Sequence, residues 1–491
     1  MEHLDVLVIG AGLSGVGAGA YLERECPWAD YAVFEAREAI GGTWDLFRYP
    51  GIRSDSDMFT LGYSFRPWDG EHSIADGPSI LRYIEDTARE TGVDKHIRFH
   101  HKIVAAEWST TDAQWIVTAQ RSDTGETFQL SADFVFACTG YYRYDEGYTP
   151  EFPGAELFRG EIVHPQHWPE DLDYDGKRIV VIGSGATAVT LIPSLAKTAS
   201  HVTMLQRSPT YIVSMPAKDP VAQLLRRLLP QRFNAPIIRW FKALTTQASY
   251  FVSQRQPALV KRALRRQLER QLPAGYDIDR HFTPSYNPWD QRLCLVPNGD
   301  LFKAIGAGSA SVVTDTVNTF DATGIVTDSG EHLDADIIVT ATGLDLLFLG
   351  GMSLTVDGEP VDVSTRLAYK GMMLEGVPNM AMAIGYTNAS WTLKCDLTCD
   401  YVVRLLDYMR REGFGQCTPT NTDAGLSAAP LLGLKSGYIQ RAEGRMPKQG
   451  SKFPWQVKQS YLADFRVMKL KPVTDAAMVF SNHRKAEAVH G

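Results

Sequence analysis

The chain has 491 residues, of which 44% are hydrophobic and 22% are charged, a composition typical of a globular protein with several domains. Its 57 acidic and 49 basic residues give a formal net charge of −8, which argues against a nucleic-acid binder because phosphate-backbone binding favours a basic surface. The six cysteines form no CxxC pair and no disulfide framework, so we expect a reducing, cytoplasmic environment.

The first predicted elements form a dinucleotide-binding unit. Residues 4–9 are an apolar segment of strand length, a GxGxxG turn follows at residues 10–15, and a helical pattern continues to about residue 25. Glycines let the backbone approach a pyrophosphate, and the helix N-terminus offers free N–H groups. A second strand at residues 31–34 ends where a carboxylate would meet the adenosine ribose. The predicted contacts are Gly10, Gly12, Ser14, Gly15 and Glu35, and such a site at the start of a chain is typical of FAD.

The same segment carries no charge between Asp5 and Glu23, as a signal or membrane-anchor sequence would. Its five glycines are too many for an isolated apolar helix, and acidic residues precede it. No other apolar run reaches the length of a membrane span. We therefore predict neither a signal peptide nor a transmembrane helix.

Two further groups of residues are not required by nucleotide binding. The first group holds Gly41-Gly42-Thr43-Trp44, then Tyr49-Pro50-Gly51 and finally Asp55. The second group has the spacing FxGxxxHxxxWP and consists of Phe158, Gly160, His164, Trp168 and Pro169. The histidines here and at positions 96, 100, 101 and 167 show no metal-ligand spacing with carboxylates, so we predict no metal site.

A second dinucleotide-binding unit is predicted near the middle of the chain. Residues 178–182 form an apolar strand, and the turn that opens the next helix consists of Gly183, Ser184, Gly185, Ala186 and Thr187. The following strand, residues 202–205, leads to Arg207 and Ser208, where an NADH site would have a carboxylate. Both residues can pair with a 2′-phosphate, so the pattern predicts NADPH in preference to NADH, unless Arg207 is only a solvated surface cation.

Two dinucleotide sites in one chain indicate electron transfer from a nicotinamide to a flavin. The strands at residues 134–139 and 337–342 each end in Thr-Gly, at Thr139-Gly140 and Thr342-Gly343. Such turns are typical of the connections between the two domains of these flavoproteins, although each dipeptide alone fits any strand end. We include Thr342 and Gly343 among the candidate cofactor-binding residues.

Residues 221–272 have a helical pattern that we expect to be broken at Pro230, Pro236 and Pro257. This basic insertion contains eleven Lys and Arg residues but one acid, Glu269, so its net charge is +10 and the rest of the chain carries −18. The insertion could steer NADPH, could place an apolar face on anionic lipid as a peripheral membrane contact, or could be a solvated helical face over a core stripe.

In this order, the motifs resemble those of type I Baeyer–Villiger monooxygenases. Residues 41–55 and 158–169 match both fingerprints of that family at every fixed position, and the resemblance covers roughly residues 5–460. Segments such as GGTWDLFRYPGIRSDSDM and GYTNASWTLK look closest to the bacterial branch that activates thioamide prodrugs such as ethionamide. Members use FAD, NADPH and O₂ to convert ketones to esters or lactones, and they also oxygenate sulfur in sulfides or thioamides. Sibling flavin-containing monooxygenases have Tyr or Phe in place of Trp168-Pro169.

The resemblance also implies roles for individual residues. In the family, reduced flavin adds O₂ at its C4a carbon, and an arginine stabilises the peroxide and the charge of the carbonyl adduct; Arg292 matches that arginine. Asp55 would hold and tune it, unless Arg292 only forms a surface ion pair with Asp290. Gly42, Thr43, Trp44 and Asp55 would contact the flavin cofactor, whereas His164 and Trp168 would couple nicotinamide movement to catalysis as positioning residues.

One position departs from the family pattern. Gln291 stands where many members have a lysine that helps to bind the 2′-phosphate, so the NADPH preference depends more on Arg207 and Ser208. Bulky side chains such as Tyr63, Phe65, Trp68 and Trp391 could line the substrate pocket, but core packing explains each of them as well.

The order of motifs predicts an α/β fold with two Rossmann-like dinucleotide-binding domains and a helical insertion. The FAD domain would comprise residues 1–147 and 346–491, the NADPH domain residues 150–214 and 285–345, and the insertion residues 215–284. The oligomeric state is left open. Three rival functions also stay open: a flavin-containing monooxygenase of nitrogen or sulfur without ketone activity, an uncoupled NADPH oxidase, and a nucleotide-binding regulator with a degenerate flavin site.

Overall fold

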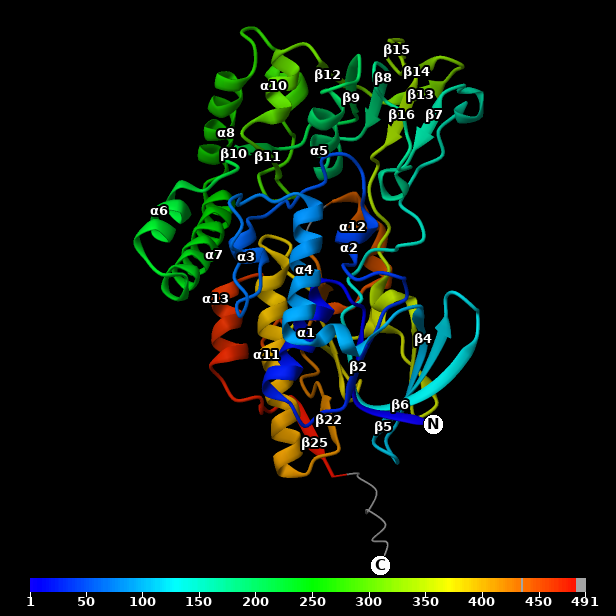
Figure 1. Ribbon diagram of the computed structural model, residues 1–491, viewed down its shortest axis with the longest axis vertical. Coiled ribbons are helices and arrows are strands. Elements are labelled where there is room, and N and C mark those ends of the chain that lie inside the picture. The colour runs from blue at the N-terminus through cyan, green and yellow to red at the C-terminus, as the bar shows by residue number, and fades with distance from the viewer. Residues whose placement is uncertain (434–435, 483–491) are drawn as a thin grey trace, which may run out of the picture.

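The computed structural model describes residues 1–433 and 436–482 of the chain (Figure 1). Two parts are visible, each built around its own sheet. Strands β1, β2 and β4 to β6 lie in the lower part of Figure 1, whereas β7 to β9 and β12 to β16 lie in the upper part. Helices α6 and α7 project from the left side, and the N-terminus lies beside the lower sheet.

The first sheet has nine strands in the order β18-β17-β4-β5-β6-β1-β2-β3, with β21 beside β6. Strands β1, β2, β3, β6 and β21 are parallel, whereas β4 and β5 extend the sheet in antiparallel fashion. β6 serves both arrangements because residues 127–132 pair with β5 and residues 135–137 pair with β21. The strands are β1 (Glu2–Ile9), β2 (Tyr31–Phe34), β3 (Ile97–Arg98), β4 (His101–Ser109), β5 (Gln114–Arg121), β6 (Thr127–Ala137), β17 (Ser353–Val356), β18 (Glu359–Pro360) and β21 (Met380–Met382).

The two faces of this sheet pack against different layers, because alternate side chains of a strand point to opposite sides. Val8 and Phe136 belong to a core cluster with residues of helices α1 (Leu13–Glu25), α4 (Gly77–Thr91) and α11 (Trp391–Glu412). Leu7 and Val135 belong to a second cluster that contains Trp115. The charge-free segment near the N-terminus is therefore divided between a buried strand and a buried helix.

The second sheet is fully parallel, with the order β12-β9-β8-β16-β7. Its strands are β7 (Glu161–Val163), β8 (Arg178–Ile182), β9 (His201–Gln206), β12 (Ala310–Thr314) and β16 (Ile337–Thr340). Helices α5 (Ala186–Leu195) and α10 (Asp300–Gly306) pack on one face, and an antiparallel sheet of β13 (Val317–Phe320), β14 (Gly324–Thr327) and β15 (His332–Asp334) covers the other. The predicted α/β class with two parallel-stranded units and a helical insertion is thereby confirmed.

The insertion lies between β10 (Ile212–Met215) and β11 (Cys294–Pro297), which pair in parallel. It contains α6 (Pro220–Leu228), α7 (Gln231–Arg255), α8 (Pro257–Gln271) and α9 (Ile278–Phe282). Pro230 and Pro257 stand at helix starts, but the break predicted at Pro236 is wrong because α7 continues through it. A proline there removes one backbone hydrogen bond, to the carbonyl of exposed Arg232, which water can satisfy.

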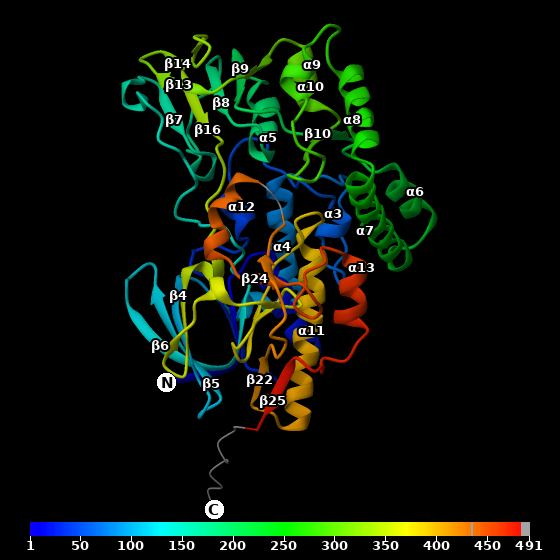
Figure 2. The ribbon, with the colours of Figure 1, turned by 180° about the vertical axis from the view of Figure 1, so that it is seen from behind.

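Shorter elements complete the described chain. Helix α12 lies between the two parts of the molecule when it is seen from behind (Figure 2). The short helices are α2 (Thr43–Leu46), α3 (Met58–Leu61), α12 (Gly437–Ala442) and α13 (Tyr461–Asp464). The remaining strand pairs are β19 (Ala368–Tyr369) with β20 (Met373–Leu374), β22 (Gln416–Pro419) with β25 (Met478–Ser481), and β23 (Ala428–Pro430) with β24 (Lys448–Gly450). Single helical turns occur at Val93–His96, Ala155–Leu157, Pro165–His167, Phe348–Gly351, Val363–Thr365, Glu443–Arg445 and Phe465–Lys469.

Within residues 1–433 and 436–482, no helix has both the length and the apolar character needed to cross a membrane.

All six cysteines are buried and unpaired, so we expect their thiols to react slowly. Burial raises the pKa of Cys26, Cys294, Cys395 and Cys417 to about 12. Because only a thiolate attacks a disulfide reagent, we expect the folded protein at pH 8 to react about a thousandfold more slowly than free cysteine. Absorbance at the reagent's thiol band would measure this rate, and the same protein in denaturant should react fully. Fast labelling of any thiol in the folded protein would contradict the expectation.

Candidate active site

A cavity of about 440 Å³ opens where strands β1, β2 and β6 of the first sheet end. Ligands of open parallel sheets bind beyond the carboxyl ends of the strands, so this is the expected place for one. The cavity brings together nine of the residues predicted to be catalytic or cofactor-binding, which lie between residues 10 and 55 and at residue 292. They are Gly10, Gly12, Ser14, Glu35, Gly42, Thr43, Trp44, Asp55 and Arg292.

The first glycine motif combines a ligand-facing surface with a packing contact. Gly10 has a φ of +101°, and a Cβ at this position would lie 2.7 Å from the carbonyl oxygen of Cys138. A Cβ at Gly15 would lie 1.7 Å from the carbonyl oxygen of Gly10, so Gly15 permits α1 to start directly against β1. Gly15 does not line the cavity, whereas Gly12 and Ser14 do. The hydroxyl of Ser14 accepts a hydrogen bond of 2.8 Å from Nε1 of Trp391.

Glu35 is fixed at the end of β2 and is 6% exposed. Its carboxylate accepts the backbone N–H of Ala11 at 2.8 Å and that of Arg37 at 2.9 Å. These two bonds hold one carboxylate beside the glycine turn while it still lines the cavity. An anionic acceptor in this place suits the hydroxyls of a ribose.

Sequence reasoning missed the cation next to Glu35. Nη2 of Arg37 lies 2.6 Å from Oδ2 of Asp45, and its guanidinium is stacked 5.9 Å from the ring centre of Tyr144. Arg37 lines the cavity together with Lys102, so positive charge is available beside the glycine turn. The position of Arg37, two residues beyond Glu35 at the end of the same strand, is the signal that could have revealed it.

Asp55 and Arg292 form an ion pair at the cavity wall, with Nη2 of Arg292 2.8 Å from Oδ2 of Asp55. Among the described residues, Asp55 is the one hydrogen-bonding or ion-pair partner of Arg292, so the other N–H groups of this guanidinium are available to a ligand. Burial disfavours its charge, but the carboxylate of Asp55 and nearby phenols outweigh that effect and hold the pKa of Arg292 above its ordinary value. The predicted pairing of these two residues is thus what the geometry shows, and no ion pair joins Arg292 to Asp290.

The turn that presents Arg292 is strained and anchored. Trp289 has a φ of +72°, an unusual value for a bulky residue. Its ring packs edge to face against Tyr250 of α7, with 5.7 Å between ring centres. Because α7 belongs to the basic insertion, the insertion helps to fix the segment that carries Arg292.

A group of tyrosines, which the sequence analysis did not identify, surrounds this ion pair. Tyr141 and Tyr142 follow the Thr139-Gly140 turn and line the cavity, and Tyr438 comes from α12 near the end of the chain. Burial raises the pKa of all three phenols, so they are neutral hydrogen-bond donors at ordinary pH. The ring of Trp391 lies 5.1 Å from that of Tyr141 and lines the cavity too.

The other bulky candidates lie elsewhere. Tyr63 is 2% exposed, donates its hydroxyl to the carbonyl of Leu13 and stacks on Phe65, so both rings belong to the core around α1. Trp68 borders a separate cavity of about 320 Å³ beside α6 and α7. Within the described residues, the one trio of potential metal ligands is His3, Asp5 and Asp133, near the start of β1, and none of the histidines at 96, 100, 101, 164 and 167 takes part.

The first fingerprint runs from the cavity to the second sheet and back. Its beginning, Gly42 to Trp44, lines the cavity. Its middle touches α5 so closely that a Cβ at Gly51 would lie 1.9 Å from Oγ of Ser194, and Arg53 forms an ion pair with Asp300 of α10. Its end, Asp55, returns to the cavity at Arg292. This segment therefore fixes the glycine turn of one unit relative to the helices of the other.

The second fingerprint does not line the cavity; it holds the chain where it crosses between the sheets. A Cβ at Gly160 would lie 2.2 Å from the carbonyl oxygen of Asp336, which permits β7 to pair with β16. The ring of His164 contacts Gly147, where a Cβ would lie 1.9 Å away, and Gln166 donates to the carbonyls of Arg143 and Tyr144. Burial lowers the pKa of His164, although its backbone contact with Gly343 opposes the shift.

The aromatic members of this fingerprint are structural in their contacts. Phe158 packs edge to face on Phe320 with 6.5 Å between ring centres, and Trp168 packs on Tyr174 at 6.3 Å. The carbonyl of Pro169 accepts the N–H of Leu172 at 3.4 Å. These contacts attach the segment to the second unit on both sides of His164.

The second glycine motif lies on an open surface at the end of β8. Gly183 has a φ of +133°, and a Cβ there would lie 2.3 Å from the carbonyl oxygen of Ala341. By contrast, a Cβ at Gly185 would meet nothing within 4 Å, and Gly185 and Ala186 are exposed at the start of α5, followed by half-buried Thr187. Backbone N–H groups at this helix start are accessible to a pyrophosphate.

Arg207 and Ser208 lie beside this motif, at the end of β9. The hydroxyl of Ser184 donates to the carbonyl of Ser208 at 3.2 Å, which joins the turn to the following strand. Arg207 is exposed and has no hydrogen-bond or ion-pair partner within the described parts of the chain, so its charge is free. Thr342 and Gly343 do not line the cavity; the hydroxyl of Thr342 donates to the carbonyl of Tyr148 at 2.6 Å, between the two crossings.

Comparison with known proteins gives a consistent family. Residues 4–350 match the family described as flavin-binding monooxygenase-like. The chain is 54% identical over 481 residues to the FAD-containing monooxygenase EthA of Mycobacterium tuberculosis, which covers 98% of each chain. Its fold is similar to that of a steroid monooxygenase bound to NADP, with a TM-score of 0.71, 24% identity and coverage of 85% of this chain and 88% of the other. OTEMO in complex with FAD and NADP gives a TM-score of 0.71 at 22% identity, covering 85% and 86%.

The two glycine motifs yield a paired prediction. Gly15→Ala places a methyl group on the Gly10 carbonyl, where backbone surrounds it, so we expect a loss of roughly 3 kcal/mol or more in the free energy of unfolding. Gly185→Ala meets open space and should change that free energy by no more than about 0.5 kcal/mol. Urea unfolding followed by circular dichroism would measure both. Similar losses for the two variants would show that the close contact at Gly15 is not the constraint described.

Proposed function

The chain belongs to the flavin-binding monooxygenase-like family, and on that premise we propose that it is an FAD-containing, NADPH-dependent monooxygenase. Its proposed reactions insert one oxygen atom from O₂ into ketones, giving esters or lactones, and oxygenate the sulfur of sulfides or thioamides. The observation that carries this proposal is the Asp55–Arg292 ion pair, which lies in the same cavity as the first glycine motif.

The cavity residues fit FAD by their chemistry. Backbone N–H groups at the start of α1 suit a pyrophosphate, and Glu35 suits the adenosine ribose. Arg37 and Lys102 supply compensating charge. At the other side of the cavity, Trp44, Tyr141 and Trp391 offer aromatic surface for an isoalloxazine. That EthA is named an FAD-containing monooxygenase supports the assignment.

The second glycine motif fits NADPH. Gly185 leaves room for a pyrophosphate at the start of α5, and the free guanidinium of Arg207 suits a 2′-phosphate. His164 and Trp168 are proposed to position the nicotinamide half, because they belong to the segment that holds both crossings between the sheets. The similar fold of OTEMO with FAD and NADP supports two cofactors in one chain.

The proposed division into domains follows the same logic. Residues 1–147 and 346–491 would form the FAD domain, and residues 150–214 and 285–345 the NADPH domain. In support, the first sheet takes its strands from residues 2–137 and 353–382, whereas the second takes them from residues 161–340.

Arg292 is the proposed catalytic cation. A bound flavin supplies electrons from NADPH to O₂ and so provides the reactive oxygen atom. Attack on a ketone moves negative charge onto the carbonyl oxygen of the substrate, and a fixed guanidinium stabilises that charge. Asp55 engages one N–H of Arg292 and leaves the others facing the cavity, so it orients the cation without neutralising all of its donors. The rings of Tyr141, Tyr142 and Trp391 line this part of the cavity and limit water.

We expect the wild-type enzyme to consume NADPH and O₂ in equal amounts and to form an equal amount of oxygenated product from a ketone or a sulfide. Arg292→Ala should still oxidise NADPH but form product roughly 100- to 1,000-fold more slowly, because one preorganised donor at a developing oxyanion contributes about 3 to 4 kcal/mol. Product analysis beside oxygen and NADPH consumption would measure both rates.

Asp55→Asn tests the orienting carboxylate, since it preserves the shape of the side chain and removes its charge. Without the carboxylate the pKa of Arg292 falls but stays far above neutral, so product formation should decrease without a new limb in the pH profile between pH 7 and 9. Equal oxygenation by Arg292→Ala and wild type would overturn the assigned role. Consumption of NADPH and O₂ without product from any ketone or sulfide would favour an NADPH oxidase, and product from sulfides alone would favour a sulfur monooxygenase.

Arg207→Ala should weaken the binding of NADPH and leave the binding of NADH almost unchanged. A charge-assisted hydrogen bond contributes about 1.5 to 3 kcal/mol, so KM for NADPH should rise roughly 10- to 100-fold while KM for NADH changes little. Steady-state kinetics with both nucleotides would measure this, and Lys197→Ala, another exposed cation of the same unit, is the control. An equal rise for both nucleotides would exclude recognition of the 2′-phosphate by Arg207.

A further inference from the structure

The basic insertion exposes an unusual amount of apolar surface. Ten large apolar side chains of α6, α7 and α8 are between 41% and 68% exposed. We call them the insertion surface: Val221, Leu224, Leu228, Phe233, Ile237, Phe241, Leu244, Phe251, Val252 and Leu259. Contiguous exposed apolar surface of this kind marks a contact with another molecule.

Six of the ten side chains belong to α7, a helix of 25 residues. Four of them, Phe233, Ile237, Phe241 and Leu244, follow at intervals of three or four residues, so they form a single stripe along the helix. The opposite face is buried against the body of the protein and is mixed, because Ile238 and Ala243 lie there beside polar residues such as Arg239. The large apolar side chains of α7 are therefore mainly on its exposed side, the reverse of a solvated helix over a core stripe.

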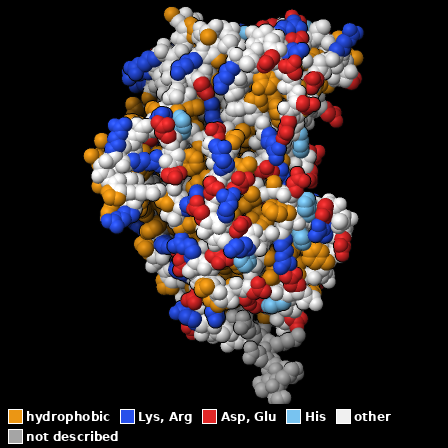
Figure 3. All heavy atoms as spheres, in the orientation of Figure 1, with side chains coloured by type: hydrophobic (Ala, Val, Ile, Leu, Met, Phe, Trp, Pro, Cys, Tyr) orange, Lys and Arg blue, Asp and Glu red, His pale blue; other side chains and the backbone are white. Residues whose placement is uncertain are grey.

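Unpaired cations occur on the same three helices. Between residues 221 and 272, seven Lys and Arg residues have no ion-pair or hydrogen-bond partner among the described residues: Arg227, Arg232, Arg255, Lys261, Arg262, Arg266 and Arg270. The single acid of this range, Glu269, is already paired with Arg265. Figure 3 shows Lys and Arg side chains interspersed with hydrophobic ones along the left edge, over α6 and α7.

We propose that the insertion surface docks on an anionic phospholipid bilayer. Apolar side chains of an interfacial helix enter the acyl boundary, while Arg and Lys at its border meet the lipid phosphates. A second copy of this chain is the less favourable occupant, because a two-fold interface would bring two segments of net charge +10 together.

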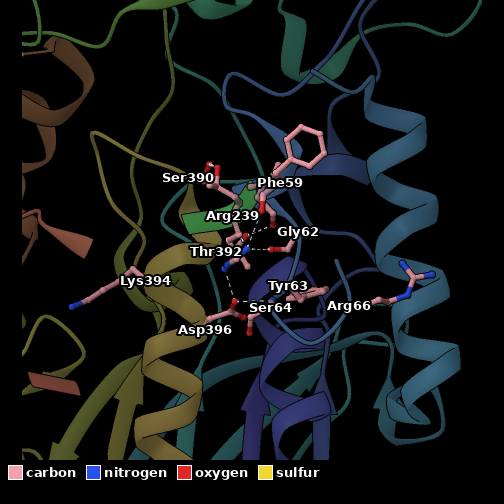
Figure 4. Close-up of polar contacts among 12 residues, drawn as sticks. Phe59, Gly62, Tyr63, Ser64, Arg66, Arg239, Ser390, Thr392, Lys394 and Asp396 are labelled. Carbon is pink, nitrogen blue, oxygen red and sulfur yellow. Dashed lines mark hydrogen bonds and ion pairs between the residues drawn. The ribbon is translucent and has the colours of Figure 1, made fainter. Parts of the chain in front are cut away.

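The insertion is held rigidly enough to present this surface in one orientation. Arg239, on the buried side of α7, donates to the backbone carbonyl of Gly62 at 2.5 Å and to the carboxylate of Asp396 at 2.6 Å. Figure 4 shows Arg239 between these two partners, with Asp396 projecting from α11, the helix whose first residue is Trp391. This ion pair joins α7 to α11, whose first residue, Trp391, lines the cavity.

The test uses the full-length, FAD-loaded protein and sedimentation with vesicles. We expect it to sediment with vesicles of phosphatidylglycerol and phosphatidylcholine, and at least tenfold less with phosphatidylcholine alone. Raising the salt to about 0.5 M should release most of the bound protein, because it screens attraction between exposed charges. This readout does not depend on activity, so it stands even if the proposed oxygenation fails.

Two pairs of variants separate the insertion surface from general effects. Ile237→Asp with Phe241→Asp should abolish sedimentation, whereas Leu157→Asp with Leu470→Asp, at apolar positions elsewhere that are even more exposed, should not. Reversing Arg227, Arg232 and Arg255 to Glu should weaken binding at least about a hundredfold, because the loss of each cation costs roughly fivefold and the new carboxylates are repelled by the anionic lipid. Reversing Arg82, Lys95 and Lys197 to Glu makes the same change in net charge outside the insertion and should have little effect.

Because all these side chains are exposed, unfolding temperature and flavin absorbance should match those of the wild type, and both serve as folding controls. Equal weakening by the two charge-reversed variants would overturn the proposal, as would equal binding to uncharged vesicles that ignores salt. Absence of vesicle binding, together with an oligomer in sedimentation velocity that Ile237→Asp with Phe241→Asp dissociates, would assign the surface to a second copy instead.

Discussion

The arrangement of the two units depends on the pairing of the two segments that cross between them. Tyr142 and Leu346 are bridge partners, and the N–H of Arg143 donates to the carbonyl of Asp345 at 2.9 Å. The carboxylate of Asp345 also lies 3.3 Å from Arg143 and 2.8 Å from Arg445, which ties the segment after α12 to both crossings. Since Arg292 is carried by the second unit and the glycine turn by the first, this double crossing determines whether the two can share one cavity.

The two fingerprints make physical sense in this frame. One runs from the cavity to α5 and α10 and back to Asp55, and the other places His164 against Gly147 and Gly343, one residue from each crossing. Both contain glycine where a neighbouring atom comes closer than a Cβ allows, as at Gly51 and Gly160. Such positions can be recognised in a sequence because the constraint is local: the residue must be glycine, and its spacing from the other motif residues is fixed. The α/β class, the strand–turn–helix units and the family could therefore be predicted, whereas the domain boundaries and residue roles stay predictions.

Other parts of the site could not be predicted, because they depend on contacts between distant segments. Tyr438 reaches the Asp55–Arg292 pair from a segment nearly 150 residues beyond Arg292. No periodicity marks this residue. Tyr63 is an example of the opposite kind. The sequence left open whether it lines the substrate pocket or packs in the core, and the structure places it in the core against α1. The expected break at Pro236 was wrong for a related reason: the rule for proline describes one lost hydrogen bond, and the surroundings decide whether that loss ends a helix.

Helices α6 and α7 of the basic insertion are held against the body of the protein mainly by polar contacts. Helices α8 and α9 join the core of the second unit through residues such as Leu268 and Phe282. Helices α6 and α7 bury few apolar side chains, in two small clusters around Ile238 and Ala243, so hydrophobic contact alone cannot orient them. Hydrogen bonds from arginines orient these helices instead. Arg239 donates to the backbone carbonyl of Gly62 and to the carboxylate of Asp396, and Arg226 donates to the carbonyl of Gly70 at 2.8 Å. A buried ion pair adds little net stability compared with apolar packing, but it tolerates only one geometry. An element that must keep its apolar side chains outside, and still hold one orientation, is attached most effectively in this way.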